Sequence, residues 1–242
     1  MPVSTQTWKI GDCLDLMREY PDNYFDLVLT DPPYGIGEAN GKNIKRGGRT
    51  NFGGKKGKYV AATNYGYKKW DNKKIEKEYF NEMLRISKNQ IIFGGNYYTD
   101  YLTPSSCWIV WDKRNGRNDF ADCELAWTSF KSAVRIFRYK WNGMLQENMK
   151  KKENRVHPTQ KPTPVFTWIL KKYSNEGDLI CDPFLGSGTT LEACRKTNRN
   201  CIGFEISDEW EHLYADRCMK HTPPLQSYFE NGGSDQNGKT KD

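Results

Sequence analysis

The sequence lacks several features that would assign it to other classes of protein. No apolar run approaches the roughly 20 residues that a membrane-spanning helix needs. The seven cysteines form no Cys-X-X-Cys pair, which argues against a disulfide framework and a thiolate zinc site. His212 and His221 have no acid or histidine at a spacing suited to a metal, so we expect surface residues. The N-terminus lacks the basic-then-apolar layout of a secretory signal, and we expect a cytoplasmic protein.

A local excess of positive charge is the clearest compositional feature. Net charge is +7, and residues 38–74 contain eleven Lys and Arg residues against two acids, Glu38 and Asp71. Residues 35–67 show no helical or strand periodicity, and a segment of this length usually needs a function or a partner to order it. The charge favours a polyanionic partner. A solvated loop with ordinary exposed lysines is the simpler alternative.

Short apolar runs alternate with helical patterns along the chain, which predicts an α/β fold. Several runs are continuous and predict strands covered on both faces, as in a largely parallel sheet. The strands are expected near Trp8 and from Phe25, Gln90, Cys107, Glu124, Ala133, Asp178 and Asn200. Apolar spacings of three and four predict helices over 75–86, 165–173 and 210–218. No helix is expected over 121–139, so the strands there are predicted to be adjacent and antiparallel.

The predicted domain organisation is one domain over residues 1–222. The length of 242 residues is enough chain to bury a sizeable core. Residues 223–242 are polar and contain almost no apolar side chain after Phe229, so we expect a disordered tail.

Residues 177–207 combine a strand, a glycine turn, a helix and a second strand: GDLICDPFLGSGTTLEACRKTNRNCIGFEIS. This is the pattern of a βαβ nucleotide site. Gly186 and Gly188 allow a tight turn close to a ligand, and the helix from Thr189 directs its free N–H groups at that ligand. Glu205 ends the second strand, where a carboxylate accepts hydrogen bonds from ribose hydroxyls. A turn that only packs the helix on the strand is the simpler alternative.

Asp182 distinguishes this turn from a dinucleotide site. It precedes Gly186 by four residues, and Leu191 occupies the position of the third glycine. A negative charge beside the turn would repel a pyrophosphate. It suits a ligand that is positively charged there, such as S-adenosylmethionine with its ammonium and sulfonium groups.

Three motifs in this order resemble the signature set of the amino-group DNA methyltransferases. They are DPPY at Asp31 to Tyr34, HPTQKP at His157 to Pro162 and DPFLGSGTT at Asp182 to Thr190. A catalytic motif first and a cofactor motif last is the permuted order of the family's beta class, which holds adenine-N6 and some cytosine-N4 enzymes. The resemblance covers most of residues 7–220. It implies a Rossmann-like methyltransferase sheet, mostly parallel with an antiparallel strand.

The resemblance implies a role for each motif. In the family, an acid placed like Asp12 contacts the adenine region of the cofactor, and the segment matching HPTQKP lies beside the methionine end. The implied catalytic residues are Asp31, Pro32, Pro33 and Tyr34. The implied cofactor-binding residues are Asp12, Cys13, His157, Thr159, Lys161, Asp182, Phe184, Gly186, Ser187, Gly188, Thr189 and Glu205.

The DPPY turn suits methylation of an exocyclic amine, whose lone pair is delocalised into the base. The Asp31 carboxylate and the Pro32 carbonyl can each accept one amine hydrogen and so aim the lone pair at the methyl group. The two prolines fix φ at successive positions and hold both acceptors in place. Tyr34 is expected to stack on the target base, which must leave the duplex.

The nature of the methylated base is less determined than the class of enzyme. An aspartate at the first position of the tetrapeptide leans towards adenine-N6, whereas serine leans towards cytosine-N4. Cytosine-N4 methylation therefore stays open. So do methylation of structured RNA, which the motif order disfavours, and a nucleic-acid-binding module without turnover.

Duplex DNA is the partner that the resemblance implies. The basic insert, residues 35–74, follows the DPPY turn at once and is expected to bind phosphates. Its predicted DNA contacts are Lys42, Lys45, Arg46, Arg49, Lys55 and Lys56. Residues 135–156 lie where the family has its target-recognition segment. A homodimer and a cognate restriction endonuclease are further partners by resemblance.

Overall fold

The structure is a computed structural model of the chain, and it describes residues 4–36, 48–52, 55–60, 73–115, 121–142, 145–153, 157 and 160–219. The tail predicted to be disordered, 223–242, and most of the basic insert lie outside these residues. Among the described residues, no helix is long and apolar enough to cross a membrane.

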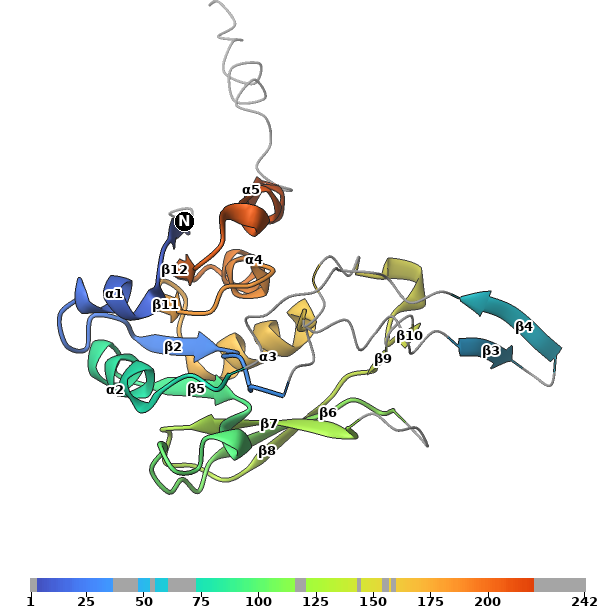
Figure 1. Ribbon diagram of the computed structural model, residues 1–242, viewed down its shortest axis with the longest axis horizontal. Coiled ribbons are helices and arrows are strands. Elements are labelled where there is room, and N and C mark those ends of the chain that lie inside the picture. The colour runs from blue at the N-terminus through green and yellow to red at the C-terminus, as the bar shows by residue number, and fades with distance from the viewer. Residues whose placement is uncertain are drawn as a thin grey trace, which may run out of the picture.

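An eight-stranded sheet forms the centre of the molecule (Figure 1). In spatial order its strands are β1 (Gln6–Ile10), β12 (Asn200–Glu205), β11 (Leu179–Asp182), β2 (Leu27–Thr30), β5 (Gln90–Phe93), β7 (Cys123–Thr128), β6 (Trp108–Asp112) and β8 (Arg135–Arg138). Every neighbouring pair is parallel except the two that involve β7. The predicted mostly parallel sheet with an antiparallel strand is confirmed.

One detail of the strand prediction is wrong. β7 and β8 run in opposite directions but are not adjacent, because β6 lies between them and pairs Ile109 with Ala126 on one side and with Arg135 on the other. β6 and β7 pair in antiparallel register, so the chain folds back between them as a hairpin. β8 then joins the free edge of β6.

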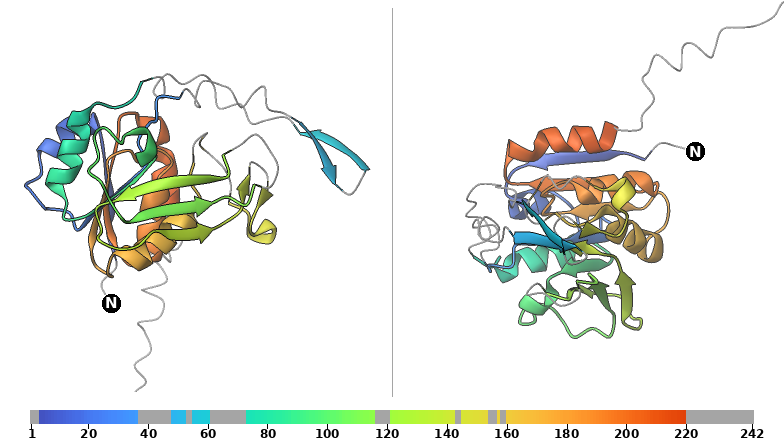
Figure 2. Two further views of the ribbon diagram at one scale, coloured as in Figure 1. Left: turned by 90° about the horizontal axis from the view of Figure 1, so that it is seen from below. Right: turned by 90° about the vertical axis from the view of Figure 1, so that its right-hand side faces the viewer.

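Helices cover both faces of the sheet (Figure 2). One face carries α1 (Cys13–Arg18) and α2 (Lys77–Ile86), and the other carries α3 (Thr163–Tyr173), α4 (Thr189–Lys196) and α5 (Glu211–Met219). Short 3₁₀ turns are η3 (Gly95–Tyr97), η4 (Met149–Lys151) and η5 (Asp208–Trp210). Two hairpins lie apart from the sheet: β3 (Gly48–Phe52) with β4 (Lys55–Val60), and β9 (Trp141–Asn142) with β10 (Leu145–Gln146).

The central strand β2 is buried on both faces because its side chains alternate between two cores. Val28 faces α2, where Phe80, Met83 and Ile86 recur every three residues and are fully buried. Leu29 faces the opposite core. This two-sided burial is why the β2 sequence reads as a continuous apolar run.

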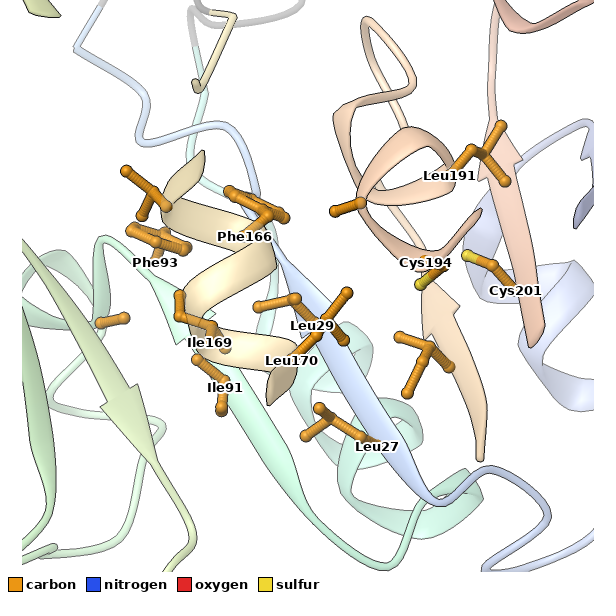
Figure 3. Close-up of a cluster of buried hydrophobic side chains, with 14 of the residues drawn as sticks. Leu27, Leu29, Ile91, Phe93, Phe166, Ile169, Leu170, Leu191, Cys194 and Cys201 are labelled. Carbon is orange, nitrogen blue, oxygen red and sulfur yellow. The ribbon is translucent and has the colours of Figure 1, made fainter. Parts of the chain in front are cut away.

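The core under α3 is shown in Figure 3. Phe166, Ile169 and Leu170 point from one face of the helix towards the sheet. The ring of Phe166 stacks on that of Phe93 at 5.3 Å with an interplanar angle of 5°. This packing fixes α3, and hence the segment that precedes it, against the end of β5.

Replacing Leu29 with alanine tests this core. Leu29 is fully buried, so the change removes apolar burial and leaves a cavity, at a cost of about 2–5 kcal/mol in the free energy of unfolding. Urea unfolding measures the loss. Leu145→Ala is the matched control: Leu145 is 37% exposed, so this change should stay within about 0.5 kcal/mol. Equal losses in the two variants would contradict the described core.

Candidate active site

The two motifs farthest apart in sequence meet where the strand order reverses. β11 pairs in parallel with β2, and the chain leaves β11 towards β12 on one side but leaves β2 towards β5 on the other. Ligands of open α/β sheets bind outside the carboxyl ends of the strands at such a point. The Thr30 hydroxyl donates to Asp182 Oδ1 at 2.7 Å. This bond joins the residue before DPPY to the first residue of the glycine motif.

A cavity of about 320 Å³ opens at this junction. Asp31 and Pro33 of the DPPY turn line it together with Gly186 of the glycine turn. The other predicted residues in its wall are Asp12, Cys13, His157, Lys161, Asp182, Phe184, Ser187, Thr189 and Glu205. Sequence reasoning missed further lining residues, namely Ile75, Tyr79, Gln160, Phe166, Pro183, Leu185, Thr190, Phe204, Ile206 and Trp210.

The Glu205 carboxylate accepts a hydrogen bond from the backbone of the glycine turn and fixes its position. Gly186 and Gly188 adopt positive φ angles of 52° and 74°, which L side chains rarely adopt. The Gly186 N–H donates to Glu205 Oε2 at 2.8 Å, and Glu205 Oε1 accepts from the N–H groups of Ile206 and Ser207. Burial raises the pKa of Glu205. Oε2 accepts only one of these three bonds and keeps a second lone pair for a ligand hydroxyl. Gly188 does not line the cavity and is the N-cap residue of α4.

Asp182 is the most enclosed acid of the cavity wall. Its carboxylate accepts from the hydroxyls of Thr30 and Thr190 and from the Phe184 N–H. Burial raises its pKa to about 6, although the three hydrogen bonds act in the opposite direction. A cationic ligand in the cavity would favour the ionised form.

Asp12 and Tyr79 form the far wall. Asp12 caps α1 by accepting the Leu14 N–H at 2.8 Å, and the Tyr79 hydroxyl lies 3.3 Å from its Oδ2. Cys13 is buried beside them, and burial raises the pKa of its thiol far above the usual range. The protonated thiol therefore contributes apolar surface. The Tyr79 ring lies 6.2 Å from that of Phe184, so this end combines an acid with aromatic faces.

His157, Gln160 and Lys161, which are described residues of the HPTQKP segment, line a third side of the cavity. His157 is buried and meets the Trp210 ring edge-on at 4.6 Å. Thr159 lies outside the described residues. The Lys161 carbonyl accepts from the Thr189 hydroxyl at 3.1 Å, which ties this segment to the start of α4.

The side chain of Lys161 points to the catalytic motif. Its Nζ lies 2.5 Å from Asp31 Oδ2 and 3.0 Å from Glu124 Oε2. Glu124 pairs in turn with Lys113 at 2.5 Å. Sequence reasoning missed Glu124 and Lys113. The only available signals were the acid in DCELAW and the lysine in WDK, and neither stands beside DPPY in the sequence.

The DPPY turn is fixed by aromatic neighbours. The Tyr34 hydroxyl donates to Asp31 Oδ1, and the ring stacks on Tyr97 at 4.8 Å. The Pro33 carbonyl accepts from the Tyr98 hydroxyl. The Pro32 carbonyl accepts no hydrogen bond from the described residues, so it keeps both lone pairs for a substrate. Pro32 and Tyr34 do not line the 320 Å³ cavity.

The predicted DNA contacts are described only in part. Lys42, Lys45 and Arg46 lie outside the described residues. Arg49, Lys55 and Lys56 belong to the β3–β4 hairpin. The hairpin projects from the sheet on the same side of the molecule as β9 and β10 (Figures 1 and 2). The segment predicted for target recognition contributes β8 to the sheet edge and the β9–β10 hairpin.

The cavity fits a cationic nucleoside cofactor such as S-adenosylmethionine. Its volume falls within the usual range of ligand pockets. Asp12 and Glu205 supply acceptors for hydroxyl and amino groups, and Asp182 supplies negative charge next to the glycine turn. Ile75 and Tyr79 supply an apolar wall for a base.

An α/β sheet with a ligand-sized cavity at its switch point is the arrangement of a Rossmann-like fold. Comparisons with known proteins identify the family. The sequence profile of the N6/N4 DNA methylase family matches residues 95–216. The type II methyltransferase M2.MboI of Moraxella bovis is 25% identical over 91% of this chain and 90% of its own length.

Two solved structures share the fold. The cytosine-N4-specific PvuII DNA methyltransferase superposes with a TM-score of 0.59 at 13% identity, covering 94% of this chain and 91% of its own. The M1.HpyAVI–SAM complex superposes with a TM-score of 0.50 at 20% identity, covering 89% of this chain and 100% of its own.

The chain belongs to the N6/N4 DNA methylase family. Membership confirms the predicted class of enzyme, a DNA methyltransferase that uses S-adenosylmethionine, and the predicted Rossmann-like fold.

Gly94 offers a test of the DPPY geometry. It has a φ of +66°, and a Cβ there would overlap the Tyr34 ring. We expect Gly94→Ala to displace Tyr34 and to lower DNA methyltransferase activity at least about tenfold, since small misplacements of catalytic groups are costly. Transfer of labelled methyl groups to DNA measures the effect.

Gly177→Ala is the matched control for this prediction. Gly177 has a φ of +86° but nothing within 4 Å of its Cβ position. It should therefore lose only the roughly 1–2 kcal/mol of left-handed backbone strain and keep its activity. Similar activity in the two variants would show that the contact with Tyr34 is unimportant.

Asp182 predicts a pH-dependent contribution to stability. Its pKa rises from 3.8 to about 6 on folding, so the folded state binds more protons between these values. Stability from this group is present at low pH and is lost as pH rises through about 6. Asp182→Asn removes this dependence. The difference in unfolding free energy between variant and wild type should therefore shift in favour of the variant across that window, as measured by urea unfolding. Parallel curves would contradict the assignment.

Proposed function

We propose that the protein methylates the exocyclic N6 amine of adenine in a base flipped out of duplex DNA. The observation that carries the proposal is the single cavity lined by both Asp31 and Gly186. A methyl donor on the glycine turn and an amine on the DPPY turn would thus share one site. The aspartate at the first position of DPPY supports adenine over cytosine.

The chain's own residues divide into those that hold the cofactor and those that hold the base. Asp12, Asp182 and Glu205 are the proposed anchors of S-adenosylmethionine, and the turn at Gly186 lets it approach the backbone. When bound, S-adenosylmethionine supplies an electrophilic methyl group on a sulfonium centre. His157 and Trp210 close the cavity beside the turn and exclude water.

Asp31 and Pro32 act on the amine. The Asp31 carboxylate accepts one amine hydrogen through a lone pair that Tyr34 and Lys161 leave open, and the Pro32 carbonyl accepts the other. Both acceptors are held before the substrate arrives, so no reorganisation is needed. As the nitrogen bonds to the methyl group and the methyl–sulfur bond breaks, with S-adenosylhomocysteine as the leaving group, the nitrogen becomes acidic. Asp31 is the adjacent base that can take its proton. Tyr34 supports the base pocket through its stack on Tyr97.

Partners beyond DNA form part of the proposal. The basic β3–β4 hairpin, with Arg49, Lys55 and Lys56, is proposed to bind phosphates beside the flipped base. The likeness to M2.MboI, a type II methyltransferase, supports a cognate restriction endonuclease. A homodimer and a cytoplasmic location complete the proposal.

Cytosine-N4 methylation is the second candidate, favoured by the fold shared with the cytosine-N4-specific PvuII enzyme. A module that binds DNA without turnover is the third. The Pro32 carbonyl, to which none of the described residues donates a hydrogen bond, and the preformed cavity favour catalysis over binding alone.

Labelled S-adenosylmethionine and duplex DNA distinguish the three. The wild type should transfer label to N6-methyladenine, identified by nucleoside analysis, and Asp31→Ala should lose at least about 100-fold in rate because one of the two amine acceptors is gone. Cofactor binding by Asp31→Ala, measured by calorimetry, serves as the folding control. Label in N4-methylcytosine would transfer the proposal to cytosine. No label in DNA would overturn it.

A further inference from the structure

Four buried or half-buried charges alternate in sign beside the catalytic motif. They run from Lys113, after β6, through Glu124 on β7 and Lys161 before α3 to Asp31 after β2. Their side chains are between 9% and 20% exposed. We call this set the charge chain. Its members come from four separate segments, so the fold alone brings them together.

Lys161 alone would be a poor neighbour for an amine methylation site. An ammonium 2.5 Å from Asp31 competes with the substrate amine for the carboxylate. It also places positive charge where the nitrogen becomes positive in the transition state. In a partly desolvated site these effects are larger than in water. Glu124, 3.0 Å from the same ammonium, offsets both.

We propose that Glu124 is a positioning residue for methyl transfer. It binds the Lys161 ammonium together with Asp31, and this weakens the hold of Lys161 on Asp31 enough for Asp31 to accept a hydrogen bond from the substrate amine. This rests on the proposed function of Asp31. Lys113 sets how much of the charge of Glu124 is available to Lys161.

The geometry argues against a purely structural ion pair. Glu124 Oε2 meets Lys161 without a well-aligned hydrogen bond, whereas Asp31 Oδ2 accepts one. Buried pairs seldom add stability over apolar side chains of similar size. The acid at this position is therefore better explained by its effect on Lys161 and Asp31.

Several charged or titratable groups face Asp31 among the described residues. They are Tyr34 from its own turn, Lys161 from the segment before α3, Glu124 from β7 and Asp182 from β11. Burial raises the pKa of Asp31, Lys161 lowers it and Glu124 raises it. For Glu124, burial is outweighed by Lys161 and Lys113, which lower its pKa to about 2. Glu124 is therefore ionised wherever Asp31 titrates.

The test is the pH profile of kcat/KM for DNA, whose acid limb reports Asp31 in the free enzyme. Glu124→Gln removes an anion, so the pKa of Asp31 should fall. The acid limb of the profile should therefore shift to lower pH by about 0.5–1 pH unit. The plateau of kcat should fall about tenfold, with little change in KM, because Lys161 then competes with the amine for Asp31. Lys113→Met removes the second partner of Glu124, so Glu124 interacts more strongly with Lys161 and Lys161 less strongly with Asp31. The acid limb of this variant should therefore shift to higher pH.

Glu82→Gln is the matched control. Glu82 is 18% exposed and pairs with Arg85 at 2.7 Å, but it lies on α2 outside the charge chain. Its variant should keep the wild-type pH profile whatever stability it loses. Asp182 remains in all variants, so differences between the limbs do not report it.

The outcomes separate this inference from the proposed function. If the wild type transfers no methyl group to DNA, the proposed function fails. If the wild type is active but the limbs of Glu124→Gln and Lys113→Met coincide with its own, the positioning role of Glu124 alone is overturned. Should Glu124→Gln not fold, as judged by circular dichroism, the limb of Lys113→Met decides: an upward shift supports the role and an unchanged limb refutes it.

Discussion

The structure depends on the parallel pairing of β2 with β11. This pairing places the residue before DPPY next to the last residue before the glycine turn, and the bond from Thr30 to Asp182 fixes the two ends at 2.7 Å. Both strands are buried under helices on either face, so their register is set by core packing. The cavity, the residues that line it and the DPPY turn all take their positions from this one junction.

Electrostatics and rigidity at the site serve the same end. Asp31 receives a tyrosine hydroxyl on one oxygen and a lysine ammonium on the other, while Glu205 and Asp182 are bound by backbone and hydroxyl donors. Each acid is therefore oriented before any ligand arrives, which is how preorganised sites lower a barrier. The buried charges are stable only because each has a partner of opposite sign or several hydrogen bonds.

Local patterns made much of this predictable. The strands, the turn at Gly186 and Gly188 and the stiff DPPY turn are each determined by residues that lie close together in the sequence. The six-residue helix α1 gave no periodic signal, since its only mark is the Asp12 cap. Lys161 was assigned to the cofactor, and its contact with Asp31 was not predicted. The charge chain was invisible because Glu124 and Lys113 meet as a diagonal pair only through the register of the β6–β7 hairpin.

The central claim is that the methyl donor and the amine that accepts the methyl group share one cavity. A crystal structure of the protein with S-adenosylhomocysteine tests it most directly, because this product keeps the nucleoside and amino-acid ends of the donor. The account predicts a ligand between Asp12, Glu205 and the Gly186 turn, with its sulfur facing Asp31. A ligand bound elsewhere, or with its sulfur turned away from Asp31, would contradict the account.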